Sequence, residues 1–204
     1  MTKKDPVQVT IAWYRNTAES YKAGRSDLSR DEDNRKYFLN QLKWKKILDV
    51  WCAHGRDIKE FYKNGMDVTG IDLTPEFVNM AKENCPQAEI QLMDMRELIF
   101  EDKTFDGIRA CASLLHIPKH EVKKTLQGFH RILKRWWLLY IMVKEWIGEE
   151  YVRKEIFNNE ERFFAYRQKN EIEKILEDSH FKIQKSSINS PNNATWINIF
   201  AIAE

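Results

Sequence analysis

Two places in the first half of the chain carry residues suited to binding a nucleoside. The sequence ILDVWCAHGRD (47–57) leads an apolar run into a short polar turn, and GIDL (70–73) ends a second apolar run at Asp72. A strand that turns tightly into a helix presents free backbone N–H groups to a ligand. A carboxylate at the end of the next strand can hold a ribose diol. Asp72 lies 17 residues after Gly55, and this spacing predicts a nucleoside held across the first two strand ends.

A parallel sheet would bring these strand ends together, and the pattern after residue 46 predicts one. Short apolar runs alternate with amphipathic ones, as in βαβ units whose strands are buried on both faces. The expected strands are 47–52, 67–73, 89–93, 105–110 and 138–143. The expected helices are 7–22, 37–46, 58–64, 75–84, 120–133 and 170–178, with a loop over 24–35.

The last part of the chain predicts an excursion followed by a hairpin. Residues 146–167 show no clear period and carry several aromatic side chains, so we expect a partly helical excursion over one sheet edge. The runs 181–187 and 195–203 flank the turn-rich sequence NSPNN, which is typical of an antiparallel hairpin. The expected fold class is therefore α/β: a Rossmann-like, doubly wound, mostly parallel seven-stranded sheet with a C-terminal antiparallel hairpin.

Length and charge restrict the number of domains and the kinds of partner. A chain of 204 residues with 43% hydrophobic content suits one substantial core in a single domain. The formal net charge is only +2, which gives no reason to expect a nucleic-acid partner. Lys43, Lys45 and Lys46 cluster around Trp44 just before an apolar strand, and we expect a solvated helix end there.

Cysteine usage and the apolar runs indicate a reducing compartment and no membrane partner. Cys52, Cys85 and Cys111 are odd in number and widely spaced, without the C-x-x-C pair of a zinc site or a disulfide framework. The first residues contain no apolar targeting segment, and the longest strongly apolar run, 136–143, is too short to cross a membrane. We therefore expect a cytoplasmic protein.

The nucleoside-binding residues belong to a longer series of motifs. In order along the chain these are ILDV-x-C-x-x-G (47–55), GIDL (70–73), QLMDM (91–95), FDGIRACASLLHI (105–117) and ILK-x-x-x-LLYI (132–141). This order closely resembles the sequential motifs of class I S-adenosylmethionine-dependent methyltransferases, roughly from Trp13 to the C-terminus. ACASLLHIPK and the later RFF are similar to small tellurite-resistance-like or methyltransferase type 11-like members.

The resemblance implies S-adenosylmethionine as the cofactor and one methyltransferase domain over residues 1–204. The implied parts are an N-terminal helical lid (1–45), a cofactor-binding core (46–145), a substrate-side excursion (146–167) and a C-terminal helix and hairpin (168–204). It also implies roles for individual residues. Asp49 would lie at the base of the glycine loop, and Ala53 and Gly55 would lie beside the methionine part of the cofactor. Asp72 would bind the ribose hydroxyls, Leu73 would pack on the adenine, and Asp94 and Met95 would approach the amino edge and ring of the adenine. Ala112 and Ser113 would lie near the sulfonium. Tyr14 and Arg25 would close the pocket from the N-terminal segment.

Several of these residues have an alternative, structural interpretation. Asp72 could instead cap the helix that begins near Pro75, and Asp94 could cap the turn before Glu97. His116 follows the fourth strand, where a substrate-side base could stand, so it is a candidate catalytic residue with a purely structural role as the alternative. Cys52 and His54 alone are too few ligands for a metal site, and we expect no metal.

The chain departs from the family pattern at its glycines. Where the family usually has G-x-G-x-G after the first strand, this chain has Trp51, Ala53 and Gly55. Glycine allows unusual backbone angles and close approach of a ligand, whereas an indole needs space of its own. Lys134-Arg135-Trp136-Trp137 replaces Lys-Pro-Gly-Gly before the fifth strand, Trp146 replaces a glycine, and Arg109 replaces a frequent tryptophan. Overpacking at one site costs about 1–3 kcal/mol, so Trp51 predicts weakened cofactor binding.

The function expected is methyl transfer from S-adenosylmethionine to a nucleophile on a small molecule. The sulfonium is already a strong electrophile, so the protein needs mainly to align the acceptor and exclude water. One alternative is a methyltransferase-fold interaction module with weak or no catalysis. Another is a nicotinamide-dependent oxidoreductase, against which the missing G-x-G-x-x-G and the C-terminal hairpin count.

Overall fold

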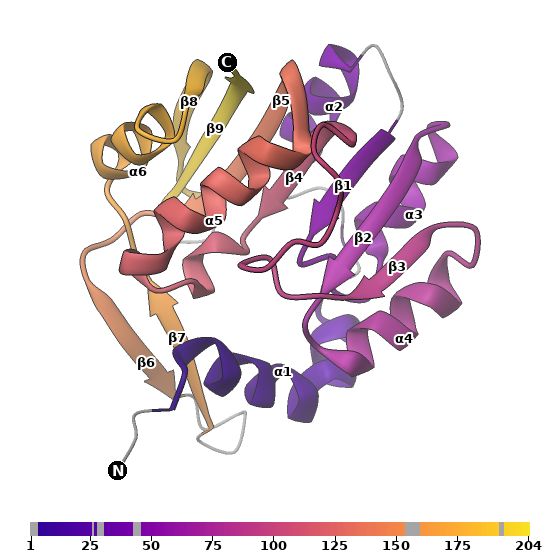
Figure 1. Cartoon of the computed structure of the whole chain (residues 1–204). Coiled ribbons are helices and arrows are strands. Elements are labelled where there is room, and N and C mark those ends of the chain that lie inside the picture. Colours follow the sequence, from indigo (N-terminus) through magenta and orange to yellow (C-terminus); the bar gives the residue numbers. More distant parts are fainter. Residues whose placement is uncertain (1–3, 26, 28–30, 43–45, 154–159, 192–193) are drawn as a thin grey trace.

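A seven-stranded sheet forms the centre of the molecule (Figure 1). The computed structural model describes residues 4–25, 27, 31–42, 46–153, 160–191 and 194–204. The strand order is β3-β2-β1-β4-β5-β9-β8, with β1 to β5 parallel and β9 antiparallel to both of its neighbours. The strands are β1 (Lys46–Val50), β2 (Asp67–Asp72), β3 (Glu89–Leu92), β4 (Phe105–Cys111), β5 (Leu133–Lys144), β8 (Phe181–Asn189) and β9 (Trp196–Ala203). This confirms the expected fold class, including the C-terminal antiparallel pair.

Helices cover both faces of the sheet, because the central strands are apolar on both sides. One core contains the inward side chains of α5 and α6 together with the start of α1. The other core contains those of α2, α3 and α4. The helices are α1 (Pro6–Ala23), α2 (Glu32–Gln41), α3 (Arg56–Lys63), α4 (Pro75–Asn84), α5 (Lys119–Ile132) and α6 (Lys169–Glu177), with a short 3-10 turn, η2, at Leu114–His116.

The first helix lies across the end of the sheet at which the parallel strands β1 and β4 terminate (Figure 1). Its start is set locally, because the Asp5 side chain accepts a hydrogen bond from the Val7 amide and Pro6 occupies the first turn. The N-terminal part of α1 packs into the sheet core, whereas Trp13 and Tyr14 pack against α4 residues.

The second helix begins earlier than expected. α2 spans Glu32–Gln41, whereas the sequence predicted a loop over 24–35 and a helix over 37–46. Arg35 is one of its buried side chains and lies 3.6 Å from the Asp57 carboxylate on another helix. A buried arginine breaks the apolar period on which the prediction relied, so the first turn was missed. The expected helix end at residues 43–45 lies outside the described residues.

The expected helical excursion was wrong for the described part of the segment. Residues Glu149–Arg153 (β6) and Glu161–Ala165 (β7) form a separate two-stranded antiparallel sheet. β7 packs against α1 and η2 (Figure 1). The side chains of β6 are mostly exposed and three consecutive side chains of β7 are buried, so neither strand shows the alternation that predicts one. Residues 154–159, including Phe157, lie outside the described residues.

The fifth strand starts earlier than predicted because it contains an irregularity. Phe105 pairs with Leu133, but Gly107 already pairs with Leu138, so the intervening residues of β5 bulge out of the ladder. Trp136 lies in this bulge with a left-handed backbone (φ 68°) and an exposed indole. Among the described residues no helix combines the length and apolar character needed to cross a membrane.

Candidate functional site

A cavity of about 440 Å³ opens at the C-terminal ends of β1, β4 and β5. In open α/β sheets ligands bind at this edge, where the strand order reverses on either side of a central strand. Here the order reverses between β1 and β4. Walls come from the turn after β1, from residues 111–116 after β4, from α1, from β7 and from the β8–β9 turn.

The turn after β1 has the unusual backbone angles that a glycine loop would adopt. Trp51, Ala53 and Gly55 all have positive φ, at 65°, 49° and 77°. A Cβ at Gly55 would lie only 2.9 Å from Ala81 on α4, so a larger residue cannot fit there without a shift. Non-glycine residues with such angles are strained and are typical of ligand sites. The turn therefore keeps the loop conformation although two of its glycines are absent.

The Trp51 indole projects among aromatic side chains beside the cavity. Its ring centroid lies 5.8 Å from that of Tyr14 and 5.2 Å from that of His116. The indole is half-buried, packs against two hydrophobic clusters and also lines the cavity. Trp51 thus occupies volume between α1 and η2 that a glycine would leave open.

Asp72 lies at the end of β2 with both carboxylate oxygens in use. The Ala53 amide donates to one oxygen at 2.9 Å, and the Thr74 amide donates to the other at 2.8 Å. Burial raises the pKa of Asp72 to about 6, against the lowering effect of these N–H donors. The carboxylate therefore links the end of β2 to the turn after β1 and to the start of α4. Thr74 is the N-cap residue of α4, so Asp72 binds the residue before the helix, and its ribose contact stays a prediction.

Asp94 is held in an ion cluster at the turn after β3. The Arg96 guanidinium donates to its carboxylate at 2.7 Å, and the Arg96 amide donates at 2.9 Å. Arg96 also binds Asp5 and Glu121, so the cluster joins the start of α1 to α5. These contacts fit the turn-capping alternative for Asp94.

The floor of the cavity contains a second ion cluster, which sequence reasoning missed. The Arg109 guanidinium lies 2.8 Å from Asp31, 3.2 Å from Asp57 and 3.4 Å from Asp49. Burial raises the pKa of Asp49 to about 7 against the attraction of Arg109. Burial also acts to raise the pKa of Asp57, but Arg109 and Arg56 outweigh it and hold that pKa below its usual value. One arginine thus gathers three acids from separate parts of the chain.

His116 is bonded on both ring nitrogens. Nδ1 lies 2.8 Å from the Phe163 carbonyl, which can only accept, so Nδ1 carries the proton. Nε2 lies 3.1 Å from the Tyr14 hydroxyl and accepts its proton in a hydrogen bond. Burial and the charge of Arg162 lower the pKa of His116 to about 3, and burial raises the pKa of Tyr14 above its usual value. The neutral imidazole ties η2 to α1 and β7, and its role as a base stays a prediction.

Only some of the predicted site residues line the cavity. Those that do are Tyr14, Arg25, Asp49, Ala53, Ala112 and His116. Gly55, Asp72, Leu73, Asp94, Met95 and Ser113 lie behind or beside its walls, and their cofactor contacts stay predictions. Lys144, Arg162 and Trp196 line the cavity but were not singled out from the sequence. A sequence signal for Arg162 was available, because Arg162, Phe164 and Tyr166 are spaced two residues apart and side chains at this spacing lie on one face of a strand.

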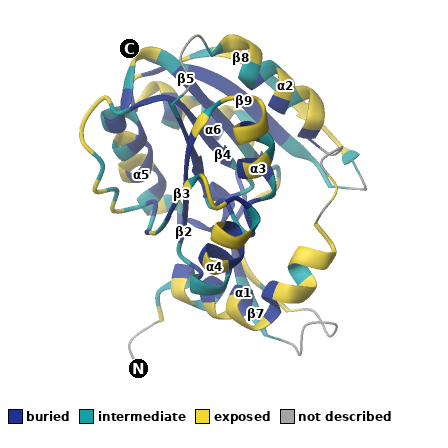
Figure 2. Cartoon of the chain, turned by 90° about the vertical axis from the view of Figure 1, so that its right-hand side faces the viewer, coloured by how far each residue is buried: buried dark blue, intermediate teal, exposed yellow. Residues whose placement is uncertain are grey.

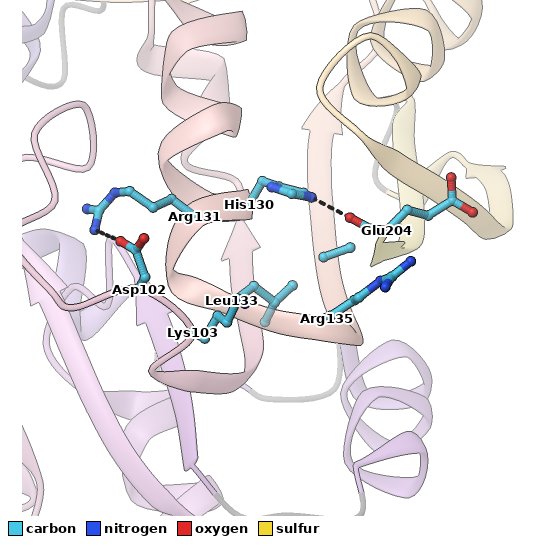
Figure 3. A pocket seen from close by; sticks show the side chains of 8 residues that line it. Asp102, Lys103, His130, Arg131, Leu133, Arg135 and Glu204 are labelled. Carbon is cyan, nitrogen blue, oxygen red and sulfur yellow. Dashed lines mark hydrogen bonds and ion pairs between the residues drawn. The ribbon is translucent and has the colours of Figure 1, made fainter.

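A second cavity, of about 520 Å³, lies at the opposite end of the sheet, where β4 and β5 begin (Figure 3). Three of its side chains already have partners: Arg131 lies 2.8 Å from Asp102, and His130 contacts the Glu204 carbonyl at 3.1 Å. This end of an α/β sheet is not where ligands usually bind. The described residues contain no group of three or more His, Cys, Asp or Glu placed to hold a metal ion.

The sequence matches a family of known proteins in its central part. Residues 47–135 match the model of a methyltransferase domain family. An uncharacterised methyltransferase of Synechocystis is 29% identical over 44% of this chain and 42% of its own length. The ubiquinone biosynthesis O-methyltransferase of Actinobacillus pleuropneumoniae is 31% identical over 56% of each chain. This chain therefore matches only about half, or less, of the length of these curated relatives.

The fold is similar to that of solved methyltransferases along nearly the whole chain. One similar structure is that of the 1,6-didemethyltoxoflavin-N1-methyltransferase of Burkholderia thailandensis, which superposes with a TM-score of 0.79. It was solved with bound 1,6-didemethyltoxoflavin and S-adenosylhomocysteine. The match covers 97% of this chain and 88% of that one at 19% identity. This likeness shows that the chain has the fold of methyltransferases.

Proposed function

We propose that this chain transfers a methyl group from S-adenosylmethionine to a nucleophile on a small molecule. The observation that carries the proposal is the family match over residues 47–135, because that segment supplies the turn after β1 and the ends of β1 and β4 that border the cavity. The finer similarity of ACASLLHIPK and RFF to the tellurite-resistance-like or methyltransferase type 11-like group is part of the same proposal.

The proposed roles follow from what methyl transfer requires. S-adenosylmethionine supplies an electrophilic methyl group when bound, so the chain must hold the cofactor, orient the acceptor and exclude water. Asp49, Ala53 and Ala112 would contact the methionine half, since they line the cavity at the β1 and β4 ends. α1 and β7 would exclude water, because both contribute side chains to the cavity wall.

The proposed ribose contact of Asp72 needs free acceptor capacity beyond its two amide bonds. Each carboxylate oxygen can accept a second hydrogen bond, so a ribose hydroxyl could add to the existing contacts. The contact favours the ionised carboxylate, whose pKa is about 6. S-adenosylhomocysteine affinity should therefore fall as the pH drops below about 6, by up to tenfold per pH unit.

Calorimetric titration of the chain with S-adenosylhomocysteine and, separately, with a nicotinamide dinucleotide tests the proposal. We expect binding of the first ligand only. Binding of the dinucleotide alone would replace the methyltransferase proposal with the oxidoreductase alternative. Binding of neither would favour an interaction module.

The interaction-module alternative is favoured by one specific observation, the half-buried Trp51 indole between Tyr14 and His116. Replacing Trp51 with Gly should tighten S-adenosylhomocysteine by at least about tenfold if the indole obstructs the cofactor. Trp136→Gly is a matched control, because Trp136 has the same left-handed backbone but lies away from the cavity. Equal tightening in both variants, or none at Trp51, would mean that the indole is accommodated in an altered pocket.

A further inference from the structure

One wall of the cavity combines aromatic rings with positive charges. Arg162, Phe164 and Tyr166 alternate along one face of β7 and its end, and the Phe164 and Tyr166 rings stack at 5.7 Å and 9°. The Arg162 guanidinium lies 4.6 Å from the Phe164 ring centroid. Lys144 Nζ lies 5.3 Å from the Tyr166 ring centroid. The two cations therefore flank a stacked aromatic pair.

A second aromatic side chain completes this part of the cavity. Lys144 at the end of β5 pairs directly with Trp196 at the start of β9. Side chains of directly opposed residues lie on the same face of a sheet, and both residues line the cavity. Phe164 lines it as well. The wall thus presents two flat apolar surfaces beside two cations.

The charges of this wall are not balanced by the acids of the cavity. Asp31, Asp49 and Asp57 are all bound by Arg109 at the floor. Within the described part of the chain, neither Arg162 nor Lys144 forms an ion pair with a carboxylate.

The acidic side chains near this wall have partners of their own. Glu150 accepts a hydrogen bond from the Tyr166 hydroxyl, and Glu161 pairs with Arg153. Arg162 donates one hydrogen bond to the Tyr14 hydroxyl and keeps further N–H groups. The wall is therefore electrostatically suited to an anion.

We propose that the methyl acceptor is a small aromatic acid that carries its nucleophile as a separate ring hydroxyl or amino group, with its ring against Phe164 and Trp196 and its carboxylate bound by Arg162 and Lys144. Arginine and lysine form charge-assisted hydrogen bonds with carboxylates, and aromatic rings pack well against aromatic side chains. This inference rests on the proposed function. The cofactor's own carboxylate is a less suitable occupant, because Lys144 and Arg162 belong to β5 and β7 and not to the turn after β1.

Benzoate, benzamide and acetate are the probes that test the proposal. They are titrated into the full chain saturated with S-adenosylhomocysteine, with binding followed by calorimetry. Benzoate should bind at millimolar concentration, and benzamide and acetate should each bind at least about tenfold more weakly. Benzamide keeps the ring without the charge, whereas acetate keeps the charge without the ring.

Lys144→Gln should weaken benzoate binding about fivefold or more and leave benzamide binding unchanged. Lys185→Gln is the matched control, because Lys185 Nζ also lies over an aromatic ring, 4.5 Å from that of Tyr37, but does not line the cavity. Arg162→Gln should have the same effect as Lys144→Gln. S-adenosylhomocysteine affinity should be retained in all three variants, which also shows that they fold.

The outcomes separate this inference from the proposed function. If S-adenosylhomocysteine binds but benzoate does not bind up to about 50 mM, the aromatic-acid inference is wrong and the methyltransferase proposal stands. Equal affinity for benzoate and benzamide, or competition between benzoate and S-adenosylhomocysteine, would also overturn it. If S-adenosylhomocysteine fails to bind, the proposed function fails, and benzoate binding to the unliganded chain then tests the wall alone.

Discussion

Two arginines in this molecule each gather three carboxylates, and they differ mainly in burial. Arg109 binds Asp31, Asp49 and Asp57 with its own side chain 2% exposed and those of the acids 3–10% exposed. Arg96 is 17% exposed, and its acids Asp5, Asp94 and Glu121 are 18–35% exposed. The buried cluster also contains two further arginines, because Asp57 pairs with Arg35 and Arg56 as well. Both clusters are built around one arginine that binds three acids, and solvent access is the main difference between those central arginines.

The difference in burial gives the two clusters different roles. Losing one member of a buried cluster strongly destabilises the folded protein, because the remaining buried charges are left without a partner and without water to solvate them. Arg109 therefore fixes the relative positions of β1, α3, β4 and residue 31 around the cavity floor. In a partly exposed cluster, water can solvate the charges that remain when one partner is removed. Arg96 therefore contributes only moderately to the stability of the contact between α1 and the rest of the fold. Figure 2 shows buried sheet strands at the centre of the molecule and exposed segments on α1.

The largest effect is expected from removing the buried guanidinium. Arg109→Met should lower the free energy of unfolding by about 3–5 kcal/mol, because it leaves buried carboxylates without their common partner. Urea denaturation measures the loss. Arg153→Met is the control, since Arg153 pairs with Glu161 at the surface and should cost at most about 1 kcal/mol. Similar losses in the two variants would remove the distinction between buried and exposed arginines.

A pH series tests whether one acid of the buried cluster holds a proton. Because its folded pKa is raised to about 7, native Asp49 binds its proton more tightly than the unfolded chain does. Its contribution to stability is fully present below the unfolded pKa of 3.8 and is lost as the pH rises through about 7.

The stability of the parent relative to Asp49→Asn should therefore fall between pH 5 and 7, by up to about 1.4 kcal/mol per pH unit. Chemical denaturation of both proteins at several pH values measures this difference. A constant difference across that range would show that Asp49 is ionised throughout.

The partly exposed cluster should respond more weakly and with a dependence on salt. Arg96→Met should lower the free energy of unfolding by about 1–2 kcal/mol, and the loss should shrink at high ionic strength. Hydrogen exchange should rise first in α1, whose capping residue Asp5 is bound by Arg96. A loss as large as that of Arg109→Met, with no salt dependence, would make the two clusters equivalent.

The smallest effect on stability is expected from replacing Asp94. The same variant also tests whether Asp94 contacts the adenine or serves only in the ion cluster. Asp94→Ala should cost about 1 kcal/mol or less, because Arg96 keeps two other acids. If Asp94 also approaches the adenine amino edge, S-adenosylhomocysteine should bind about tenfold more weakly than to the matched variant Glu121→Ala. Equal affinities of the two variants would assign Asp94 to the ion cluster alone.

The sequence by itself determined the parallel core, and it also predicted where a cofactor site would lie. The strands β1 to β4 and the helices α3 to α5 lie within about two residues of their predicted bounds, because local apolar periodicity is enough to specify buried strands and amphipathic helices. The order of motifs predicted a cofactor site at the strand ends, where the cavity lies. The left-handed angles at Trp51 and Ala53 are ones that glycine adopts most easily.

Only the tertiary structure decided which polar residues meet. Asp31 and Arg109 are 78 positions apart, and Tyr14 and His116 are 102 apart, so no local pattern could pair them. The hairpin β6–β7 was missed because β7 is stabilised by packing on α1 and η2, and the burial of its side chains does not alternate. Charges and hydrogen bonds depend on distance and burial, and in this chain both are set by how distant segments pack around the sheet.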